Sequence, residues 1–307
     1  MNILEKIVWR TRLFRVEAGN KDFAILAYGL LPQLLRSEKL FHKIILRKIT
    51  TDSLWKKLIS VTPEGDSFIF DFKGMQIQYP KNATCVPLID QYVEILLPYL
   101  DASLETKNKV QRVTPGRLRE PYEYGGAVLK KGDCIIDAGA NVGMFSIFAA
   151  QRINDSGIIY AFEPMPAPRK LLEANLQRNN IKSVTVVPCA IGEESAKKVF
   201  FTGIFKASGS AYFTRGRKER IEVDQVSCDD FVKTQGVERV DFIKVDIEGM
   251  EREFLAGAEQ TIRRFTPRMA VAAYHREGDF AMIEETLKKF VPQYTIVRTS
   301  DKIFAWV

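Results

Sequence analysis

The spacing of apolar and polar residues changes character along the chain. From residue 130 onward, short apolar runs of β type alternate with longer stretches of helical spacing. The apolar runs are CIIDAG (134–139), IIYAFEP (158–164), VTVVPCAIG (184–192), DFIKVDIEG (241–249) and RMAVAAYHR (268–276), and the helical stretches are 142–153, 166–179, 250–264 and 278–290. This alternation is typical of a parallel sheet covered by helices. We therefore predict an α/β fold with a doubly wound, mostly parallel sheet in residues 121–307.

Two β-hairpins are also predicted. The closing runs YTIVRT and KIFAWV, within residues 294–307, are near enough to pair as an antiparallel element at the edge of the sheet. Residues 66–79 alternate around a central Lys-Gly pair, a pattern typical of a hairpin turn. Most of the remaining N-terminal sequence has helical spacing. We therefore predict two domains, a mainly helical region at 1–120 that includes the first hairpin and an α/β domain at 121–307.

The net charge is concentrated at the start of the chain. The 307 residues include 45 Lys+Arg and 38 Asp+Glu, a formal net charge of +7. Residues 1–60 hold 12 basic and 5 acidic residues, which leaves 33 of each sign in the remainder. The main body is therefore neutral, which argues against a domain built to bind nucleic acid.

The basic segment 1–60 has an amphipathic pattern. Ile3, Leu4 and Ile7 can share one face of a helix, with Arg10 and Arg12 largely off that face. Two interpretations stay open. The helices pack on the main domain as a lid or as the interface of a homo-oligomer, or they attach the protein peripherally to a membrane or to a partner.

The sequence shows no pattern of export or membrane insertion. Charged residues interrupt the apolar positions at the start of the chain, and the longest apolar run there, 23–31, is too short to span a bilayer. The cysteines are Cys85, Cys134, Cys189 and Cys228. None forms a C-x-x-C pair, so free, buried thiols are expected. A cytoplasmic location is therefore predicted, with peripheral membrane contact through residues 1–60 as the variant.

The end of the first strand has the residue types of a cofactor-binding turn. The turn reads Asp137-Ala138-Gly139-Ala140-Asn141-Val142-Gly143. Its glycines allow a sharp turn and the close approach of a ligand, and the following helix offers free N–H groups. Glu163 ends the second strand, where a carboxylate can accept both hydroxyls of a ribose. Because Asp137 would repel a pyrophosphate and suits an ammonium, the pattern favours S-adenosylmethionine (SAM) over NAD.

Longer stretches around these residues resemble a known family. DAGANVGMFSIFAA, AFEPMPAPRKLLEANLQRN, the CAIG after the third strand and VDFIKVDIEGMEREFLAGAE together look like the FkbM family of SAM-dependent methyltransferases. The resemblance implies a class I, Rossmann-like methyltransferase fold with a seven-stranded sheet. It also implies O-methylation of a hydroxyl on a sugar, glycan or natural-product small molecule. The cofactor-binding residues that it implies are Asp137, Gly139, Ala140, Asn141 and Gly143 at the methionine end, Glu163 at the ribose, and Cys189 and Ala190 at the adenine.

Methyl transfer to a hydroxyl requires an aligned nucleophile, exclusion of water and removal of a proton. Alternation along the fourth strand predicts Lys244, Asp246 and Glu248 on one face, as one charged constellation. His275, at the end of the fifth strand, is one of only two histidines in the chain, and a neutral imidazole suits proton abstraction. We predict His275 as the general base, with Asp246 or Glu248 positioning it or the acceptor. A purely structural ion pair of Lys244 is the alternative.

Other interpretations stay open at this point. Mg²⁺ held by Asp246, Glu248 and His275 is a competing mechanism, but no ligand spacing demands a metal, and we predict none. The segment RGRKER (215–220) is either a solvated loop or part of a cover over an acidic acceptor. Two alternatives to an enzyme for small molecules or glycans remain. One is an RNA or protein methyltransferase that uses its basic arm, and the other is a non-catalytic SAM-binding module.

Overall fold

The computed structural model of the chain describes residues 59–72, 74–81, 121–205, 208–210 and 220–307. The chain divides into two compact units, and the second, residues 61–83 with 120–307, contains almost all of the described residues. The helices predicted at 1–60 and 88–110, Cys85 and all but the last residue of RGRKER lie outside the described residues. The division at residue 120 stays a prediction.

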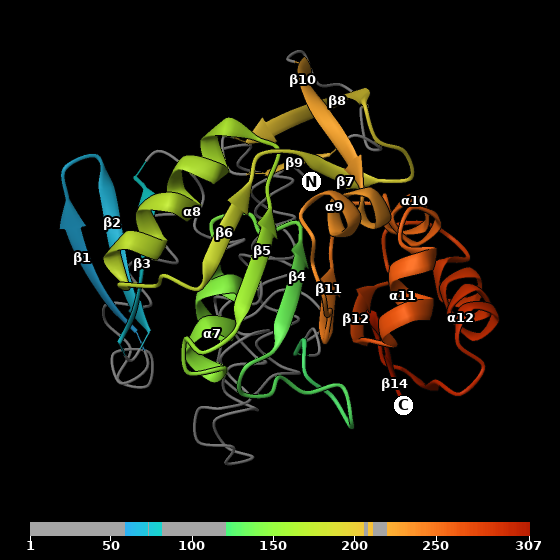
Figure 1. The fold of residues 1–307 in the computed structure, drawn as a ribbon. Coiled ribbons are helices and arrows are strands. Elements are labelled where there is room, and N and C mark those ends of the chain that lie inside the picture. The colour runs from blue at the N-terminus through green and yellow to red at the C-terminus, as the bar shows by residue number, and fades with distance from the viewer. Residues whose placement is uncertain (1–58, 73, 82–120, 206–207, 211–219) are drawn as a thin grey trace, which may run out of the picture. The chain divides into compact units, whose positions relative to one another are not determined.

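A seven-stranded sheet forms the centre of this unit (Figure 1). Its strands are β4 (Cys134–Ala138), β5 (Ile158–Phe162), β6 (Val184–Val187), β11 (Phe242–Val245), β12 (Arg268–Ala272), β13 (Thr295–Arg298) and β14 (Lys302–Trp306). Their order is β13-β14-β12-β11-β4-β5-β6, and β14 runs antiparallel to both of its neighbours while the other pairs are parallel. The predicted doubly wound sheet and its C-terminal hairpin are confirmed.

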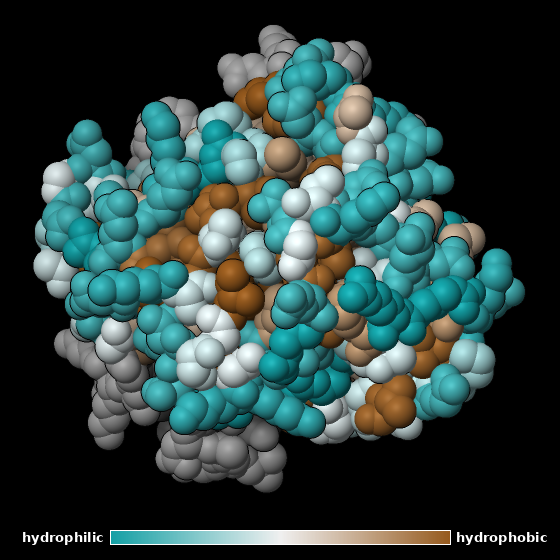
Figure 2. Space-filling view, in the orientation of Figure 1, coloured by the Kyte–Doolittle hydropathy of each residue, from teal (hydrophilic) through white to brown (hydrophobic). Residues whose placement is uncertain are grey.

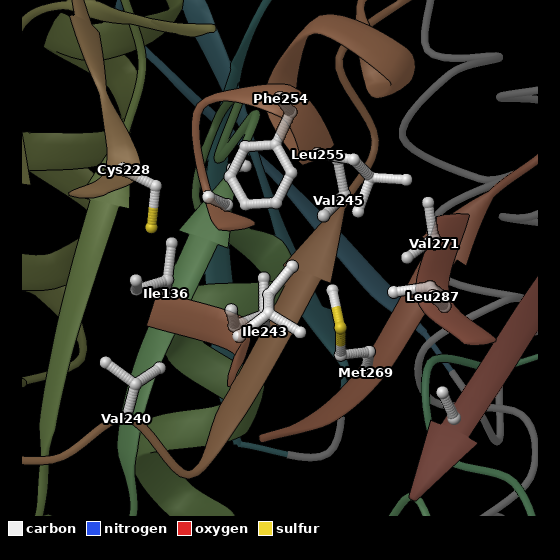
Figure 3. Packing of buried hydrophobic residues seen from close by; sticks show 14 of the residues in the cluster. Ile136, Cys228, Val240, Ile243, Val245, Phe254, Leu255, Met269, Val271 and Leu287 are labelled. Carbon is white, nitrogen blue, oxygen red and sulfur yellow. The ribbon is translucent and has the colours of Figure 1, made fainter. Parts of the chain in front are cut away.

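The central strands are apolar on both faces because helices cover both. The helices are α7 (Met144–Arg152), α8 (Pro166–Arg178), α9 (Cys228–Thr234), α10 (Glu251–Ala256), α11 (Glu259–Phe265) and α12 (Asp279–Phe290). On one face, Ile243 and Val245 of β11 pack with residues of α9 to α12, such as Phe254 and Leu287 (Figure 3). On the other face, Phe145 of α7 stacks on Phe242, with ring centroids 6.4 Å apart. This alternation along β11 places Lys244 on the α7 face.

The stretch predicted as one helix at 250–264 is two helices, α10 and α11, with a break at Gly257. The break allows the chain to approach the short strand β7 (Ala190–Gly192). A Cβ atom built at Gly257 would lie 2.1 Å from the carbonyl oxygen of Gly192, so a side chain at this position is sterically excluded. Periodicity alone did not reveal the break because both helices turn apolar residues toward the same core.

The insertion between β6 and β11 forms a second sheet that the sequence did not predict. Its four strands, in the order β7-β10-β8-β9, include β8 (Lys197–Phe205), β9 (Ser208–Ser210) and β10 (Arg220–Ser227). β10 pairs antiparallel with β8 and parallel with β7. Val223 of β10 packs with Met165, which follows β5, and with Ala190, so the second sheet lies beside the carboxyl ends of β5 and β6.

The predicted hairpin at 66–79 is present, as β2 (Ser67–Phe72) and β3 (Met75–Pro80) in the three-stranded sheet β1-β2-β3, where β1 is Ser60–Glu64. The hairpin groups with residues 120–307 rather than with the N-terminal region to which we assigned it. The reason is that β3 docks on α8: the backbone N–H of Gln78 donates to Asn175 of the helix, and that of Gln76 donates to Asn179 at its C-cap.

In the space-filling view, hydrophilic residues predominate on the visible face and hydrophobic residues gather toward its middle (Figure 2). Within the described part of the chain, no helix combines the length and apolarity that crossing a membrane requires. Three cysteines are described, and all are free thiols: Cys134 and Cys228 are buried, and Cys189 is partly exposed.

Candidate active site

The turn after β4 is held in a shape that depends on glycine. Gly139 and Gly143 have φ values of +82° and +90°, and Asn141 between them is also left-handed, at +51°. A Cβ atom at Gly139 would lie 2.0 Å from the carbonyl oxygen of Asp246, at the end of β11. The turn therefore packs against the tip of β11, and the predicted cofactor turn and the predicted chemical site are immediate neighbours.

Glu163 lies beside this turn, as expected for a ribose-binding carboxylate. One oxygen, Oε2, accepts the N–H of Asn141 at 2.9 Å, and the other, Oε1, accepts the N–H of Met165 at 2.9 Å. Each carboxylate oxygen has a further lone pair for a ribose hydroxyl. Burial raises the pKa of Glu163 to about 7, although the two backbone hydrogen bonds act in the opposite direction.

Asp137 and Lys244 form a buried ion pair beneath the turn. The two residues are register partners in β4 and β11, and Nζ of Lys244 lies 3.0 Å from Oδ1 of Asp137. Ser146 donates to the other carboxylate oxygen at 2.6 Å, and Lys244 donates to the carbonyl of Gly139 at 2.6 Å. Asp137 is fully buried. These contacts favour a role in supporting the turn from below, and direct contact of Asp137 with a ligand ammonium stays a prediction.

Cys189 and Ala190 lie where the resemblance implies an adenine site. Cys189 follows β6, and Ala190 begins β7. Ala190 packs in a small apolar cluster with Met165, which is bound to Glu163, and with Val223 of β10. The geometry brings the implied ribose and adenine residues together along the carboxyl ends of β5 and β6.

His275 is the centre of an acidic cluster at the tips of β11 and β12. Its Nδ1 lies 3.0 Å from Oε1 of Glu251, and its Nε2 lies 3.7 Å from a carboxylate oxygen of Asp246 and of Glu248. The His275 side chain is only 5% exposed, whereas Glu248 is 49% exposed. The closest carboxylate is thus that of Glu251, which is not among the site residues that we predict from the sequence.

Glu251 is held rigidly, because the same Oε1 also accepts the N–H of Ile247 at 3.0 Å and that of Gly249 at 3.3 Å. With Nδ1 beside Glu251, the imidazole presents Nε2 toward Asp246 and Glu248. Burial alone would lower the pKa of His275. The hydrogen bond to Glu251 and the charges of Glu251, Asp246 and Glu248 outweigh burial, so the pKa is raised above its ordinary value.

The predicted constellation of Lys244, Asp246 and Glu248 requires a correction. β11 ends at Val245, and Glu248 is left-handed, with a φ of +56°, so strand alternation does not extend to it. Lys244 pairs with Asp137, whereas Asp246 and Glu248 reach His275 through the loop after the strand. A left-handed residue other than glycine is uncommon and concentrates at functional loops.

Two tyrosines complete the cluster, and sequence reasoning missed their roles. The Tyr122 hydroxyl donates to Oδ2 of Asp246 at 2.6 Å, and the Tyr274 hydroxyl lies 3.4 Å from Oδ1. Ammonium groups lie near the Tyr122 ring centroid, that of Lys302 at 4.6 Å and that of Lys244 at 5.4 Å. Tyr122 lies outside the predicted strands and helices, and no local pattern marks it. Tyr274 adjoins His275 in the sequence, which was the available signal.

The strand order and the arrangement at its carboxyl edge define a class of protein. This edge carries a glycine turn after β4, a carboxylate after β5, and a histidine among acidic residues after β11 and β12. The arrangement fits SAM because the turn allows a ligand to approach the backbone closely and Glu163 can still accept hydrogen bonds from a ribose. The molecule is a class I SAM-dependent methyltransferase. Residues 137–294 match the Methyltransferase FkbM domain, and the chain belongs to that family.

Relatives of this chain include named methyltransferases. It is 26% identical over 215 residues to the 31-O-demethyl-FK506 methyltransferase FkbM of Streptomyces tacrolimicus, covering 60% of this chain and 81% of that protein. It is 26% identical over 196 residues to methyltransferase sdnD of Sordaria araneosa, covering 54% and 75%. The crystal structure of methyltransferase FkbM from Methylobacillus flagellatus KT aligns with a TM-score of 0.47 at 18% identity. That alignment covers 72% of this chain and 58% of the other.

Proposed function

We propose that this enzyme transfers the methyl group of SAM to a hydroxyl of a sugar, a glycan or a natural-product small molecule. The observation that carries the proposal is the buried His275, positioned by Glu251 on Nδ1 and facing Asp246 with Nε2. Proton removal from a neutral hydroxyl needs such a base, whereas an amine or thiolate acceptor depends on one much less. The relative from Streptomyces tacrolimicus carries an O-methylation in its name, which is in keeping with this acceptor chemistry.

In the proposed reaction, SAM supplies an electrophilic methyl group on a sulfonium. The acceptor hydroxyl would lie against Nε2 of His275 and give its proton to that nitrogen as its oxygen attacks the methyl carbon. The bond between the methyl carbon and sulfur would break at the same time, and S-adenosylhomocysteine would leave. The imidazolium that forms is stabilised by Glu251, through Nδ1–H, and by the nearby carboxylate of Asp246. Tyr122 holds Asp246 in place from the other side.

A divalent cation is the competing mechanism. Asp246, Glu251 and His275 each offer a ligand atom, and these atoms lie within 4.8 Å of one another. We favour the proton-transfer mechanism because the two imidazole nitrogens face different carboxylates. An ion on one nitrogen would leave the carboxylate at the other nitrogen as a hydrogen-bond partner only. Full activity after chelation with EDTA supports this choice, and activity restored only by added Mg²⁺ contradicts it.

The acceptor atom can be identified directly. The enzyme is incubated with SAM labelled with ¹³C in the methyl group and with a panel of glycosides, polyols and hydroxylated polyketides, and the labelled product is examined by NMR. The chemical shift of the methyl carbon separates O-methyl from N-, C- and S-methyl products. We expect an O-methyl signal. Labelled methyl on nitrogen, or on RNA or protein in place of a small molecule or glycan, contradicts the proposal.

A further inference from the structure

Asn175 of α8 and Asn179, the C-cap residue of that helix, take the place of a neighbouring strand along the free edge of β3. Gln76 N–H donates to Oδ1 of Asn179 at 2.9 Å, and Nδ2 of Asn179 donates back to the Gln76 carbonyl at 2.6 Å. One helical turn earlier, Gln78 N–H donates to Oδ1 of Asn175 at 2.7 Å, with Nδ2 of Asn175 3.4 Å from the Gln78 carbonyl. Residues four positions apart lie on the same face of a helix, and residues two positions apart lie on the same side of a strand. The spacing of the two asparagines therefore matches that of Gln76 and Gln78.

Asn175 makes one contact that Asn179 does not. Its Nδ2 also donates to the carbonyl oxygen of Val142 at 2.9 Å, inside the cofactor turn. Asn175 is completely buried. Within the same helix, Leu172 lies against Gly143, where an added Cβ atom would approach Cδ1 of Leu172 to 2.4 Å. The part of α8 that holds the hairpin therefore also supports the turn.

The Val142 carbonyl matters because its orientation fixes the peptide plane that leads into left-handed Gly143 and the first turn of α7. If the buried Val142 carbonyl loses its hydrogen-bond donor, the unsatisfied oxygen destabilises the turn. The turn can reduce this free-energy cost by rotating the peptide. Rotation would displace the backbone around Asn141, whose N–H is bound to Glu163. The effect would thus reach the ribose carboxylate without any contact between Asn175 and the ligand.

We propose that Asn175 is a positioning residue for SAM and that it couples docking of the β2–β3 hairpin to the cofactor turn. Its amide joins the hairpin edge on one side to the turn on the other. Because coupling between two sites is reciprocal, SAM should tighten the hairpin as much as the docked hairpin tightens SAM binding. This inference concerns cofactor binding alone and does not depend on the acceptor.

The test compares equivalent substitutions at the two asparagines. Asn175→Leu and Asn179→Leu both remove a hairpin contact and keep a side chain branched at Cγ, but only the first removes the donor to Val142. The dissociation constant of S-adenosylhomocysteine is measured by calorimetry on the full chain. We expect a rise of about ten-fold for Asn175→Leu, equivalent to about 1.4 kcal/mol, and less than two-fold for Asn179→Leu. Equal effects of the two variants, or no effect of Asn175→Leu, overturn the proposal.

A second comparison leaves α8 intact and so guards against a variant that fails to fold. Gln78→Pro removes the N–H that Asn175 accepts, on an edge strand where that N–H faces away from β2. Hydrogen exchange of the β3 amides is followed with and without S-adenosylhomocysteine. In the unaltered chain the ligand should slow exchange of the Gln78 amide, and in Gln78→Pro the ligand should bind two- to five-fold more weakly. An unchanged exchange rate, or unchanged affinity in the variant, contradicts the coupling.

Discussion

At the scale of single residues, the site depends on how buried charges are paired. Glu251 provides the first prediction. Because its hydrogen bond and charge raise the pKa of His275, Glu251→Gln should lower that pKa. Histidine must be neutral to accept a proton, so the acid limb of the kcat–pH profile should move to lower pH, with kcat falling by about 10- to 100-fold. The pH profile of labelled-methyl transfer measures both.

The matched control is Glu253→Gln, in the same helix. Glu253 lies in α10 as Glu251 does, but its carboxylate is paired with Arg276. The acid limb of the kcat–pH profile of Glu253→Gln should stay at the pH found for the unaltered enzyme. If both variants move the limb equally, the effect is one of overall charge and not of the Glu251–His275 contact.

Direct replacement of the base is the second prediction. His275→Asn should reduce turnover by about 100-fold or more, which is the usual contribution of a general base. It should leave the affinity for S-adenosylhomocysteine nearly unchanged, because His275 lies at the β11–β12 tips and not in the cofactor turn. Parallel measurements of kcat and cofactor affinity separate the two. Unaltered turnover would remove His275 from the mechanism.

Glu163 gives a third prediction. With a pKa of about 7, it is largely protonated in mildly acidic buffer. Ribose hydroxyls donate hydrogen bonds best to the ionised form, so cofactor affinity should rise with pH through about 7, by up to about ten-fold between pH 6 and pH 8. Glu163→Gln should bind more weakly and lose this dependence. A pH-independent affinity in the unaltered enzyme would show that the carboxylate does not hold the ribose.

At the scale of elements, the junction between the cofactor turn and β11 rests on one glycine. Gly139→Ala should abolish cofactor binding, because its Cβ would lie 2.0 Å from the Asp246 carbonyl. Gly132→Ala is the control: Gly132 has a similar φ of +80°, but nothing lies within 4 Å of the added atom. The control should cost about 1 kcal/mol of stability and keep binding. Thermal unfolding measures the loss of stability in each variant, and calorimetry measures its cofactor affinity. Together they separate backbone strain, which both variants share, from the steric clash with Asp246, which only Gly139→Ala has.

The elements that the sequence predicted are those with a strong local pattern. The inner strands β4, β11, β12 and β14 are apolar runs that are buried on both faces, whereas the edge strands β6 and β13 are only partly buried but still have a clear apolar pattern. The turn and Glu163 follow from their positions at strand ends. The second sheet was missed because its strands pair within an insertion of mixed polarity. The partners of His275 depend on the left-handed Glu248 and on Tyr122, which approaches from a distant segment. Such tertiary contacts leave no periodic trace in the sequence.

At the scale of the whole molecule, the basic segment is expected to be separable from cofactor binding. Removal of residues 1–58 keeps the buried Ile59 and the strand that follows it. The truncated chain should bind S-adenosylhomocysteine within two-fold of the full chain. Two comparisons with the full chain would then assign the segment's role. If the full chain binds phosphatidylserine vesicles in a salt-sensitive way and the truncated chain does not, the segment attaches the protein to membranes. If sedimentation shows a change of oligomeric state, the segment forms the interface. Loss of cofactor binding would mean that the segment belongs to the catalytic fold.

The central claim is that the cofactor lies along the carboxyl ends of β4 and β5 with its sulfur facing His275. A crystal structure with S-adenosylhomocysteine tests this most directly. We expect ribose hydroxyls on Glu163, backbone contacts from the turn at Gly139, and the sulfur directed toward Asp246 and Nε2 of His275. A ligand held away from Glu163, or a sulfur directed away from the histidine cluster, would contradict it.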